Sequence, residues 1–589
     1  MKITIYETDK AVQKVPDANA RAVQEVPEAN TRRAVNGCFL TIIDGVLIDV
    51  TCGYTSTGVL TIPDDVKIIG KQAFEDAYVQ EVILPAGLEN IEDEAFKNST
   101  LRKIDLTNVK FLGNRVFEFS ELREITYSKY LDYVPEMCFK DSKLAEFEIP
   151  KQVTALKDCC FENTNLKVID LSGITALGDG VFFDCFSLRE IILPETITEI
   201  PVDFCRKCQC LDKIDLSHVK FIGRSAFSGC SNLDTGNLSA EIDKYAFENT
   251  AIRHLEIEDI SKVDECTYCG CDKLESVTVS NGIIPSGLFA GCNRLKNVII
   301  KEGITGIGES AFRNTAIKKL VLPSTVIIVN DNAFADCRWL EEALLNEKLD
   351  FIGCQAFMNT ISLSQISIPD KVEYIGPECF RYSGIKNIKL PKNDNFTVIY
   401  NKTFFECVNL KEVVLPDSIR QMGSGAFACC KSLQRINLDK IKLLCDKAFE
   451  GTALEKITLT ARKIGSWVFA QCKNLKEADL SGITDRQINS HLFFECTSLA
   501  KVSLPKEQIN AFGDSCFYHT AIKGITFDAK NVVVSQNAFG MTNLKRVVIS
   551  ENCDDILFQD YAFRQADVEE FVIPDFLEKV VNSDLDRIF

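Results

Sequence analysis

Residues 415–438 read LPDSIRQMGSGAFACCKSLQRINL, and variants of this stretch recur along the chain. The fullest variants have an apolar residue before Pro, then a Gly, then Ala-Phe, and they end in Leu-x-x-Ile-x-Leu. Leu84-Pro85, for example, leads in the same way to Ala95-Phe96. Recurrence at a fixed period is the sequence signature of a solenoid, in which each repeat folds as one unit and stacks on the next.

The aromatic residue that follows Ala marks each repeat and is called the anchor below. The mean spacing between anchors is about 22 residues, so each repeat is long enough for one short coil. A chain of 589 residues is too long for one ordinary compact domain, and growth by repetition accounts for its length. The 23 anchors are Phe74, Phe96, Phe117, Phe139, Phe161, Phe182, Phe204, Phe227, Phe247, Tyr268, Phe289, Phe312, Phe334, Phe357, Phe380, Phe404, Phe427, Phe449, Phe469, Phe493, Phe517, Phe539 and Phe563.

The end of each repeat, as at residues 433–438, alternates like a short strand with one buried face. Pro or Asp-Leu-Ser ends this strand, and the Gly of the Ile-Gly step permits a tight turn. One coil cannot bury its own apolar face, so neighbouring coils must stack with parallel strands about 4.8 Å apart. We therefore expect an α/β fold that leans to mostly β. It is a curved right-handed solenoid of about 23 repeats, with a parallel β-sheet on its concave face and short turns, 3-10 or helical, on its convex side.

The pattern L-x-x-I-x-L-P-x-x-[VI]-x-x-I-G-x-x-A-F-x-x-C resembles the BspA-type (Treponema pallidum type) leucine-rich repeats. The resemblance covers roughly residues 59–573. It implies a protein that binds other proteins and does not catalyse a reaction, because members of this family are bacterial surface adhesins and large protein sets in anaerobic protists. Many surface members carry an export signal, and residues 1–10 (MKITIYETDK) do not read as one.

Four parts follow from these patterns. Residues 1–35 include a small tandem duplication with Pro and polar residues, which is typical of a flexible tail or linker. Residues 36–58 hold two apolar runs around Asp44-Gly45, a strong hairpin signal, and we expect a β-hairpin that caps the stack. Residues 59–573 form the solenoid. Apolar residues at helical spacing then predict a C-terminal helical cap over 574–589.

Composition limits the possible partners and the compartment. The net charge is −18, which argues against a nucleic-acid binder, and no apolar run is long enough to span a membrane. Without an export signal we expect a cytoplasmic protein, with the cell surface or secretion by a non-standard route as the alternative. Cytosolic thiols are reduced, so the 25 cysteines should be mostly free.

Two cysteine clusters have a spacing found in metal sites. They are Cys205-x-x-Cys208-x-Cys210 and Cys266-x-x-Cys269-x-Cys271, but each offers only three of the four ligands that zinc prefers. Most other cysteines fall at fixed repeat positions, either three residues after an anchor or in place of the Ala before it. Cysteine there is a small apolar residue that is easily buried. A zinc-binding or redox function for the two clusters is therefore the weaker alternative.

Nothing in the sequence indicates an active site or a cofactor. The four histidines, at positions 218, 254, 491 and 519, are scattered. No Gly-rich phosphate loop follows a strand and opens a helix, because residues 303–308 (GITGIG) are a turn followed by the Ile-Gly step of the repeat. We expect a protein that is not an enzyme and needs neither cofactor nor metal.

A partner should bind the residues that alternate with the buried Leu and Ile of each strand. In the early coils these outward residues are mainly acidic, in the middle coils apolar residues recur in register, and in the later coils they are more basic. An apolar stripe with an aromatic residue beside it is the usual form of an interaction hot spot. The alternative is that β-branched residues simply favour strands. The candidate partner-binding residues are Glu124, Glu146, Glu148, Asn297, Ile299, Lys319, Val321, Trp339, Glu342 and Leu344.

The sequence thus predicts a non-enzymatic interaction scaffold or recognition module that binds a protein partner on the concave sheet. A cell-surface or secreted adhesin of the same family is the alternative. We expect no nucleic-acid partner and a monomer.

Overall fold

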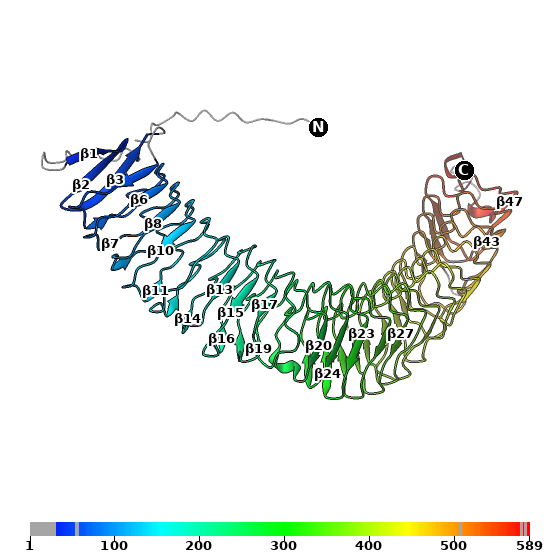
Figure 1. Ribbon diagram of the computed structural model, residues 1–589. Helices are drawn as coiled ribbons and strands as arrows, with labels where there is room; N and C mark the ends of the chain where they lie inside the picture. The colour runs from blue at the N-terminus through cyan, green and yellow to red at the C-terminus, as the bar shows by residue number, and fades with distance from the viewer. Residues whose placement is uncertain (1–30, 54–57, 506–508, 578–580, 582–585) are drawn as a thin grey trace, which may run out of the picture. The chain divides into compact units, whose positions relative to one another are not determined.

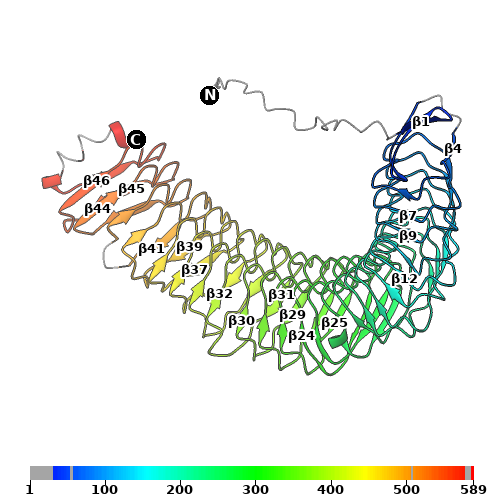
Figure 2. The same cartoon turned by 90° about the vertical axis from the view of Figure 1, so that its left-hand side faces the viewer.

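The computed structural model describes residues 31–53, 58–505, 509–577, 581 and 586–589. The described residues form short β-strands and two 3-10 helices, η1 (Ile260–Lys262) and η2 (Asp575–Leu577). They divide into two compact units, Met1–Leu144 and Ala145–Phe589, which are described here one at a time. Within each unit, successive coils follow one another in a stack (Figures 1 and 2).

Most coils of unit 2 contribute two parallel strands. One comes from the Leu-x-x-Ile-x-Leu segment, and we call these strands the leucine row. They are β13 (Val168–Asp170), β15 (Glu190–Ile192), β17 (Lys213–Ile214), β20 (His254–Ile257), β21 (Ser276–Val279), β23 (Asn297–Ile300), β25 (Lys319–Val321), β27 (Glu342–Leu344), β29 (Gln365–Ser367), β31 (Asn387–Lys389), β33 (Glu412–Val413), β35 (Arg435–Ile436), β37 (Lys456–Thr458), β39 (Glu477–Asp479), β41 (Lys501–Ser503), β43 (Gly524–Phe527), β45 (Arg546–Ile549) and β47 (Glu570–Val572).

The other strand of each coil precedes the Gly step, and these strands form the glycine row. The sequence predicted only turns here, but the segments pair because each lies one coil away from its equivalent. They are β12 (Ala155–Leu156), β14 (Ala176–Leu177), β16 (Glu199–Ile200), β18 (Phe221–Ile222), β19 (Glu241–Ile242), β22 (Gly282–Ile284), β24 (Ile304–Ile307), β26 (Ile328–Val329), β28 (Phe351–Ile352), β30 (Tyr374–Ile375), β32 (Val398–Ile399), β34 (Gln421–Met422), β36 (Leu443–Leu444), β38 (Lys463–Ile464), β40 (Gln487–Ile488), β42 (Ala511–Phe512), β44 (Asn531–Val534) and β46 (Asp555–Phe558).

Unit 1 has the same two rows. Its leucine row is β4 (Val59–Thr61), β6 (Glu81–Ile83), β8 (Lys103–Asp105) and β10 (Glu124–Thr126). Its glycine row is β5 (Ile68–Ile69), β7 (Asn90–Ile91), β9 (Phe111–Leu112) and β11 (Tyr133–Val134). The expectation of a mostly β, parallel solenoid is confirmed.

The anchors form a buried column of rings inside the stack. The rings of Phe312 and Phe334 are 5.4 Å apart and nearly parallel, and those of Phe334 and Phe357 are 5.5 Å apart. The backbone follows the same repeat, since the N–H of Phe312 donates to the carbonyl of Ala333, and the N–H of Phe334 to that of Ala356, each at 2.9 Å. Buried backbone donors need partners, so each coil depends on the next one.

The turn around each anchor has a fixed backbone geometry. The residues two before and two after the anchor have positive φ; around Phe334 they are Asn332 (56°) and Asp336 (61°). The sequence suggested that Gly is needed at the Ile-Gly step to form a tight turn. The structure gives a different reason for glycine at this position. A Cβ on Gly353 would lie 2.5 Å from the backbone nitrogen of Asp331 in the preceding coil, so glycine allows two coils to approach.

The assignment of Phe204 as an anchor is wrong. The N–H of Phe182 donates to the carbonyl of Phe204, and the N–H of Cys205 donates to that of Ala226. Cys205 therefore holds the anchor position, and Phe204 holds the position of the preceding Ala. The Phe204 ring reaches the column from one residue earlier, so it meets Phe182 and Phe227 edge-on at 78° and 84°.

Three antiparallel strands begin unit 1, and through the β3–β5 pair they join the glycine row as one six-stranded sheet. Strands β2 (Cys38–Ile43) and β3 (Val46–Cys52) flank Asp44-Gly45, and β1 (Thr31–Val35) pairs with β2. The β3 backbone continues into the first coil, since Val50 N–H donates to Ala73 O at 2.8 Å. Residues 31–35 fall within the segment 1–35 that was predicted to be a tail. They form strand β1 instead, because their backbone pairs with β2. Residues 1–30 lie outside the described residues.

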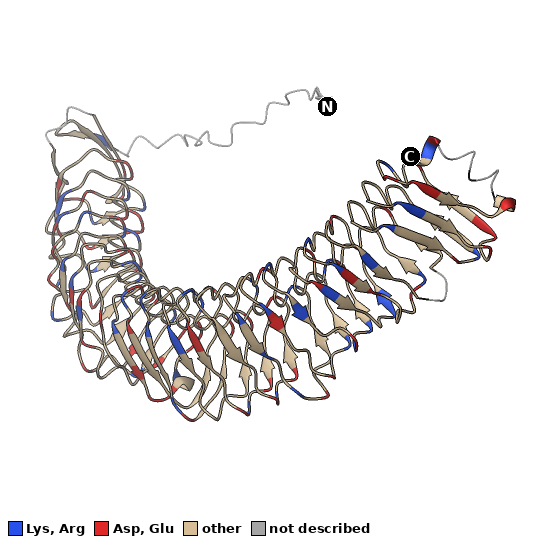
Figure 3. Ribbon diagram, turned by 90° about the vertical axis from the view of Figure 1, so that its right-hand side faces the viewer, with Lys and Arg blue, Asp and Glu red and all other residues tan. Residues whose placement is uncertain are grey.

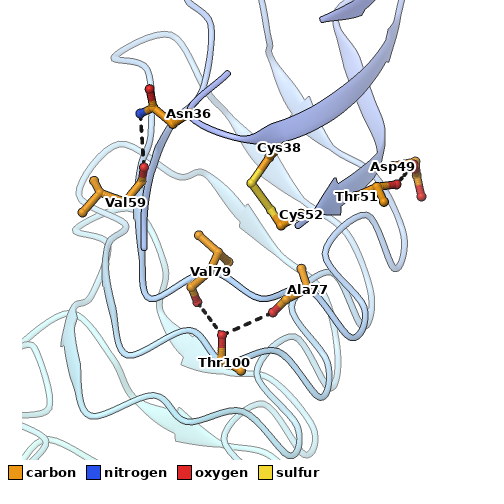
Figure 4. The surroundings of a disulfide bond; sticks show 9 residues. All are labelled: Asn36, Cys38, Asp49, Thr51, Cys52, Val59, Ala77, Val79 and Thr100. Atoms are coloured by element: carbon orange, nitrogen blue, oxygen red, sulfur yellow. Dashed lines mark hydrogen bonds between the residues drawn. A yellow bond between two sulfur atoms is a disulfide. The ribbon is translucent and has the colours of Figure 1, made fainter. Parts of the chain in front are cut away.

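Cys38 and Cys52 form a disulfide across this hairpin (Figure 4). They are register partners at its open end, with Cα atoms 4.1 Å apart. The expectation that most thiols are free holds, and this pair is the exception to it. The other 23 cysteines are free.

The C-terminal end of unit 2 continues the backbone ladder. Tyr561 N–H donates to Arg587 O at 2.9 Å, and Phe563 N–H donates to Ile588 O at 2.8 Å. The last residues thus take the place of a further coil. Much of the predicted helical cap, at residues 578–580 and 582–585, lies outside the described residues.

Candidate protein-binding face

The leucine row of unit 2 presents a repeating set of outward residues. In β25, Lys319 and Val321 are exposed and Leu320 between them is buried. The first and third residues of each strand therefore form the face, and the middle residue packs inside. Because the backbone is hydrogen-bonded to both neighbouring coils, these side chains start from a rigid frame.

Charges at the first position are paired between neighbouring strands (Figure 3). Lys319 Nζ is 2.8 Å from a carboxylate oxygen of Glu342. Glu477 lies between Lys456 and Lys501 at 3.2 and 2.6 Å, and their hydrogen bonds lower the pKa of its carboxyl. Exposed pairs of this kind add only about 0–1 kcal/mol to stability, but they neutralise the face.

The predicted acidic surface of the early coils is not built as expected. Glu124 is on β10 of unit 1, where Lys103 lies 3.9 Å from it and 3.8 Å from Glu81. Glu146 and Glu148 are exposed but belong to unit 2, and residues 145–150 form no strand. The three glutamates are therefore not brought onto one sheet, and a lysine one coil away offsets the charge of Glu124.

The apolar residues of the middle coils do gather. Ile299, Val321 and Leu344 are 58%, 50% and 44% exposed at the third position of β23, β25 and β27. Val321 and Leu344 are register partners, and β23 lies beside β25. We call these three residues the apolar stripe. Beside it at the first position lie the exposed amide of Asn297 and the Lys319–Glu342 pair.

Trp339 is highly exposed, but it lies in the turn before β27 and not on the strand face. Isolated apolar residues occur at the third position elsewhere, as at Ile192 on β15, which is 45% exposed. Its register partner on β13 is Asp170, and Asp215 follows β17 on the other side. Ile192 is therefore surrounded by charge, which makes it a matched contrast to Val321.

A shallow groove that the sequence did not reveal continues from the stripe. Leu344, Ile366 and Pro369 line its first part, and Ile388 leads on to a second part at Val414. Val414 is 69% exposed and follows β33 at the third position of its repeat. The outward position of Val414 was readable from the repeat. The groove was not, because it depends on the loops after the strands.

Half of the cysteines in the two clusters belong to the core: Cys205, Cys208 and Cys271 are buried, whereas Cys210, Cys266 and Cys269 are partly exposed. Cys205 is the anchor-position residue described above, and Cys208 is the residue three after it, with its thiol 3.0 Å from Phe182 O. Cys271 makes the same contact to Phe247 O at 3.2 Å. Among the described residues, no three His, Cys, Asp or Glu side chains come together in a way that could hold a metal ion.

Ten cysteines share this position, three residues after the anchor. Each thiol donates to the anchor-position carbonyl of the preceding coil. Thr or Ser there donates instead to the carbonyl of its own anchor, as Thr315 does to Phe312. The position therefore takes a small side chain, which in most coils donates a hydrogen bond; Ala77 and Ala566 hold it in two others. The ten are Cys185, Cys208, Cys230, Cys271, Cys292, Cys337, Cys407, Cys430, Cys472 and Cys496.

Comparison with known proteins agrees with the repeat architecture. A family model described as "BspA type Leucine rich repeat region (6 copies)" matches in overlapping segments, at residues 51–167, 110–234, 157–275, 237–341, 261–384, 350–476 and 462–584. The chain belongs to this family. The predicted resemblance is thereby confirmed. No curated protein was found to match.

Solved structures with similar chains include two bacterial proteins. A leucine-rich repeat protein from Bacteroides ovatus has 19% identity and a TM-score of 0.45, over 70% of this chain and 100% of its own. A leucine rich cell surface protein from Faecalibacterium prausnitzii has 17% identity and a TM-score of 0.28, over 80% and 94%. In the part of the chain that the structure describes, no helix is long and apolar enough to cross a membrane.

The reactivity of the thiols tests whether the cysteines of the two clusters are buried core residues or reactive groups. Burial raises the pKa of both Cys269 and Cys271 to about 11, but Cys269 is partly exposed and Cys271 is buried. Because only the thiolate reacts, iodoacetamide should modify Cys269 slowly at pH 7 and about tenfold faster for each pH unit up to about 11. Cys271 should stay unmodified until the chain unfolds. Mass spectrometry after pulse labelling measures both, and equal labelling of the two thiols in the folded protein would contradict this placement.

Proposed function

We propose that the protein is a non-enzymatic recognition module that binds a protein partner on the leucine-row face of unit 2. The observation that carries the proposal is the apolar stripe Ile299, Val321 and Leu344 on three adjacent strands. Elsewhere at this position polar or charged residues separate single apolar ones, as Asp170 and Asp215 flank Ile192. A contiguous exposed apolar patch with a polar rim is the usual mark of a protein interface.

The energetics favour this part of the face. Covering an exposed aliphatic side chain completely yields about 1.5–3 kcal/mol, and these three are still about half exposed. The neighbouring Lys319–Glu342 pair is already neutralised within the sheet. A partner that covers the stripe therefore has no isolated charge to remove from water there.

The folded repeat supports binding more than catalysis. Half of the cysteines of the two clusters serve as core residues, and burial keeps thiols such as Cys205 protonated. His254 is exposed on β20, and its Nδ1 lies 2.8 Å from Ser276 Oγ. This single hydroxyl–imidazole pair lies on the strand face with its imidazole open to solvent, and not in an enclosed site.

A charge placed in the stripe should abolish binding. We expect Val321→Lys to reduce recovery of a specific protein at least tenfold when the chain is used to capture proteins from a lysate of its source organism, because a lysine there would be buried without a partner. Ile192→Lys is the matched control, at the same strand position with similar exposure. Quantitative mass spectrometry of the retained proteins measures the ratio.

The proposal fails if every retained protein is recovered equally by the wild-type chain and the Val321→Lys variant. Equal losses with Val321→Lys and Ile192→Lys would also count against it, since that would indicate a general effect of added positive charge. Circular dichroism of both variants checks that the solenoid is intact.

A second candidate, a surface or secreted adhesin-like protein, is favoured by the Cys38–Cys52 disulfide. Disulfides persist in oxidising compartments and are rare in the cytosol. The disulfide therefore opposes the cytoplasmic expectation drawn from residues 1–10. The free cysteines do not oppose export, because most of them are buried.

The disulfide should stabilise the hairpin cap. Replacing both Cys38 and Cys52 with Ser should lower the free energy of opening the cap by about 3 kcal/mol, as expected for a loop of this size. Hydrogen exchange at the Val50 amide, which bonds to the first coil, measures the change. Cys269→Ser is the control and should change nothing there. In protein alkylated directly in source cells, an unlinked Cys38 would contradict the adhesin candidate.

A further inference from the structure

The outward residues at the third position of the leucine-row strands of unit 2 change in character along the stack, from acidic through uncharged to basic. Glu256 on β20 is followed by Thr278 on β21, then by the apolar stripe, then by Ser367 on β29 and Lys389 on β31. The five positions between the two charges are uncharged. An acidic residue thus closes one end of an uncharged window, and a basic residue closes the other.

We propose that the partner of this window is an amphipathic α-helix that lies along the row, across the strands. This rests on the proposed function, since it names the element that the apolar stripe binds. The helix would place three apolar side chains over Ile299, Val321 and Leu344. Its amino end would lie toward Glu256 and its carboxyl end toward Lys389.

The spacing of the row selects a helix over an extended segment. Paired strands are about 4.8 Å apart, and β23 and β25 are neighbours although they end two different sheets. At strand spacing throughout, the first and third stripe residues are separated by about 9.6 Å along the row. Helical residues i, i+3 or i+4, and i+7 lie on one face, and the last is about 10.5 Å from the first. In an extended chain every second residue faces the same side, which spreads three of them over about 13 Å. The helix matches the stripe to about 1 Å, and the extended chain does not.

The length of the window sets the length of the helix. Five strands span about 19 Å, which corresponds to about 13 helical residues. The two charged ends then set its direction, because a helix carries partial positive charge at its amino end and partial negative charge at its carboxyl end. Glu256 and Lys389 have exposed intramolecular partners, Lys301 at 3.2 Å and Asp370 at 3.8 Å. Both ion pairs are exposed to solvent and therefore weak, so Glu256 and Lys389 can leave these partners and interact with the ends of a bound helix.

The first-position neighbours leave room for such a helix. Beside the stripe they are Asn297, whose exposed amide can bond a polar flank, and the Lys319–Glu342 pair. Gln365 continues this side on β29. A partner helix would therefore have a narrow apolar face, with uncharged polar residues or a complementary pair of charges on the flank that meets these residues.

The test uses two libraries of 16-residue peptides of equal composition and the full chain. In one library, apolar residues stand at positions i, i+3 or i+4, and i+7 of a helix-forming sequence; in the other they alternate. Binding is measured by fluorescence anisotropy against the wild-type chain, Val321→Lys and Ile192→Lys. We expect binders only from the helical library, at least tenfold weaker with Val321→Lys and unchanged with Ile192→Lys. A photo-crosslinker at the peptide amino end should react near β20 and β21.

Each other result has a definite meaning. If alternating peptides bind and lose affinity with Val321→Lys, the helix proposal is overturned and the proposed binding face stands. If binders from neither library depend on Val321, both proposals are overturned. Crosslinking of the amino end near β31 overturns the assigned direction.

Discussion

The fold depends on one constraint: the backbone N–H groups around each buried anchor find their acceptors in the next coil. Phe312 donates to Ala333 and Phe334 donates to Ala356, and the same bond recurs throughout unit 2. No coil can therefore provide acceptors for all the backbone N–H groups of its own turn. The two ends of a stack must be covered by other segments that provide these partners. The hairpin β2–β3 does so at the start of unit 1, and the carbonyls of Arg587 and Ile588 do so at the end of unit 2.

This constraint also explains the unusual number of cysteines. Once the coils are locked at strand spacing, the position three residues after the anchor faces two carbonyls, one in its own coil and one in the preceding coil. A Thr or Ser hydroxyl reaches the first, and a Cys thiol reaches the second. The cysteines are thus interchangeable with hydroxyl residues as small buried donors. Thirteen free cysteines lie at other positions of the repeats, and Cys38–Cys52 lies in the cap, where the repeat does not apply.

The period of the anchors was enough to predict the solenoid, its leucine row and the outward position of the apolar stripe, because these follow from local alternation. What failed depends on neighbours in space. Phe204 was taken as an anchor because the sequence cannot show that the backbone ladder runs through Cys205. The repeat already placed Lys103 one coil from Glu124, but the ion pairs that Lys103 makes with Glu81 and Glu124 depend on side-chain positions. To predict the disulfide one would have needed the register of the hairpin strands. To predict the glycine row one would have needed the spacing between coils.

A rigid ladder gives the outward side chains fixed positions, and this is what makes a regular binding face from short strands. Residue-resolved hydrogen exchange of the free protein tests that ladder most directly. The amides of Phe312, Phe334 and Phe357, which donate to the next coil, should be among the slowest in unit 2, slower than the amides at the outward positions of the strand ends. If these anchor amides instead exchange as fast as those of exposed loop residues such as Ser324, the coils are not held together in the way described.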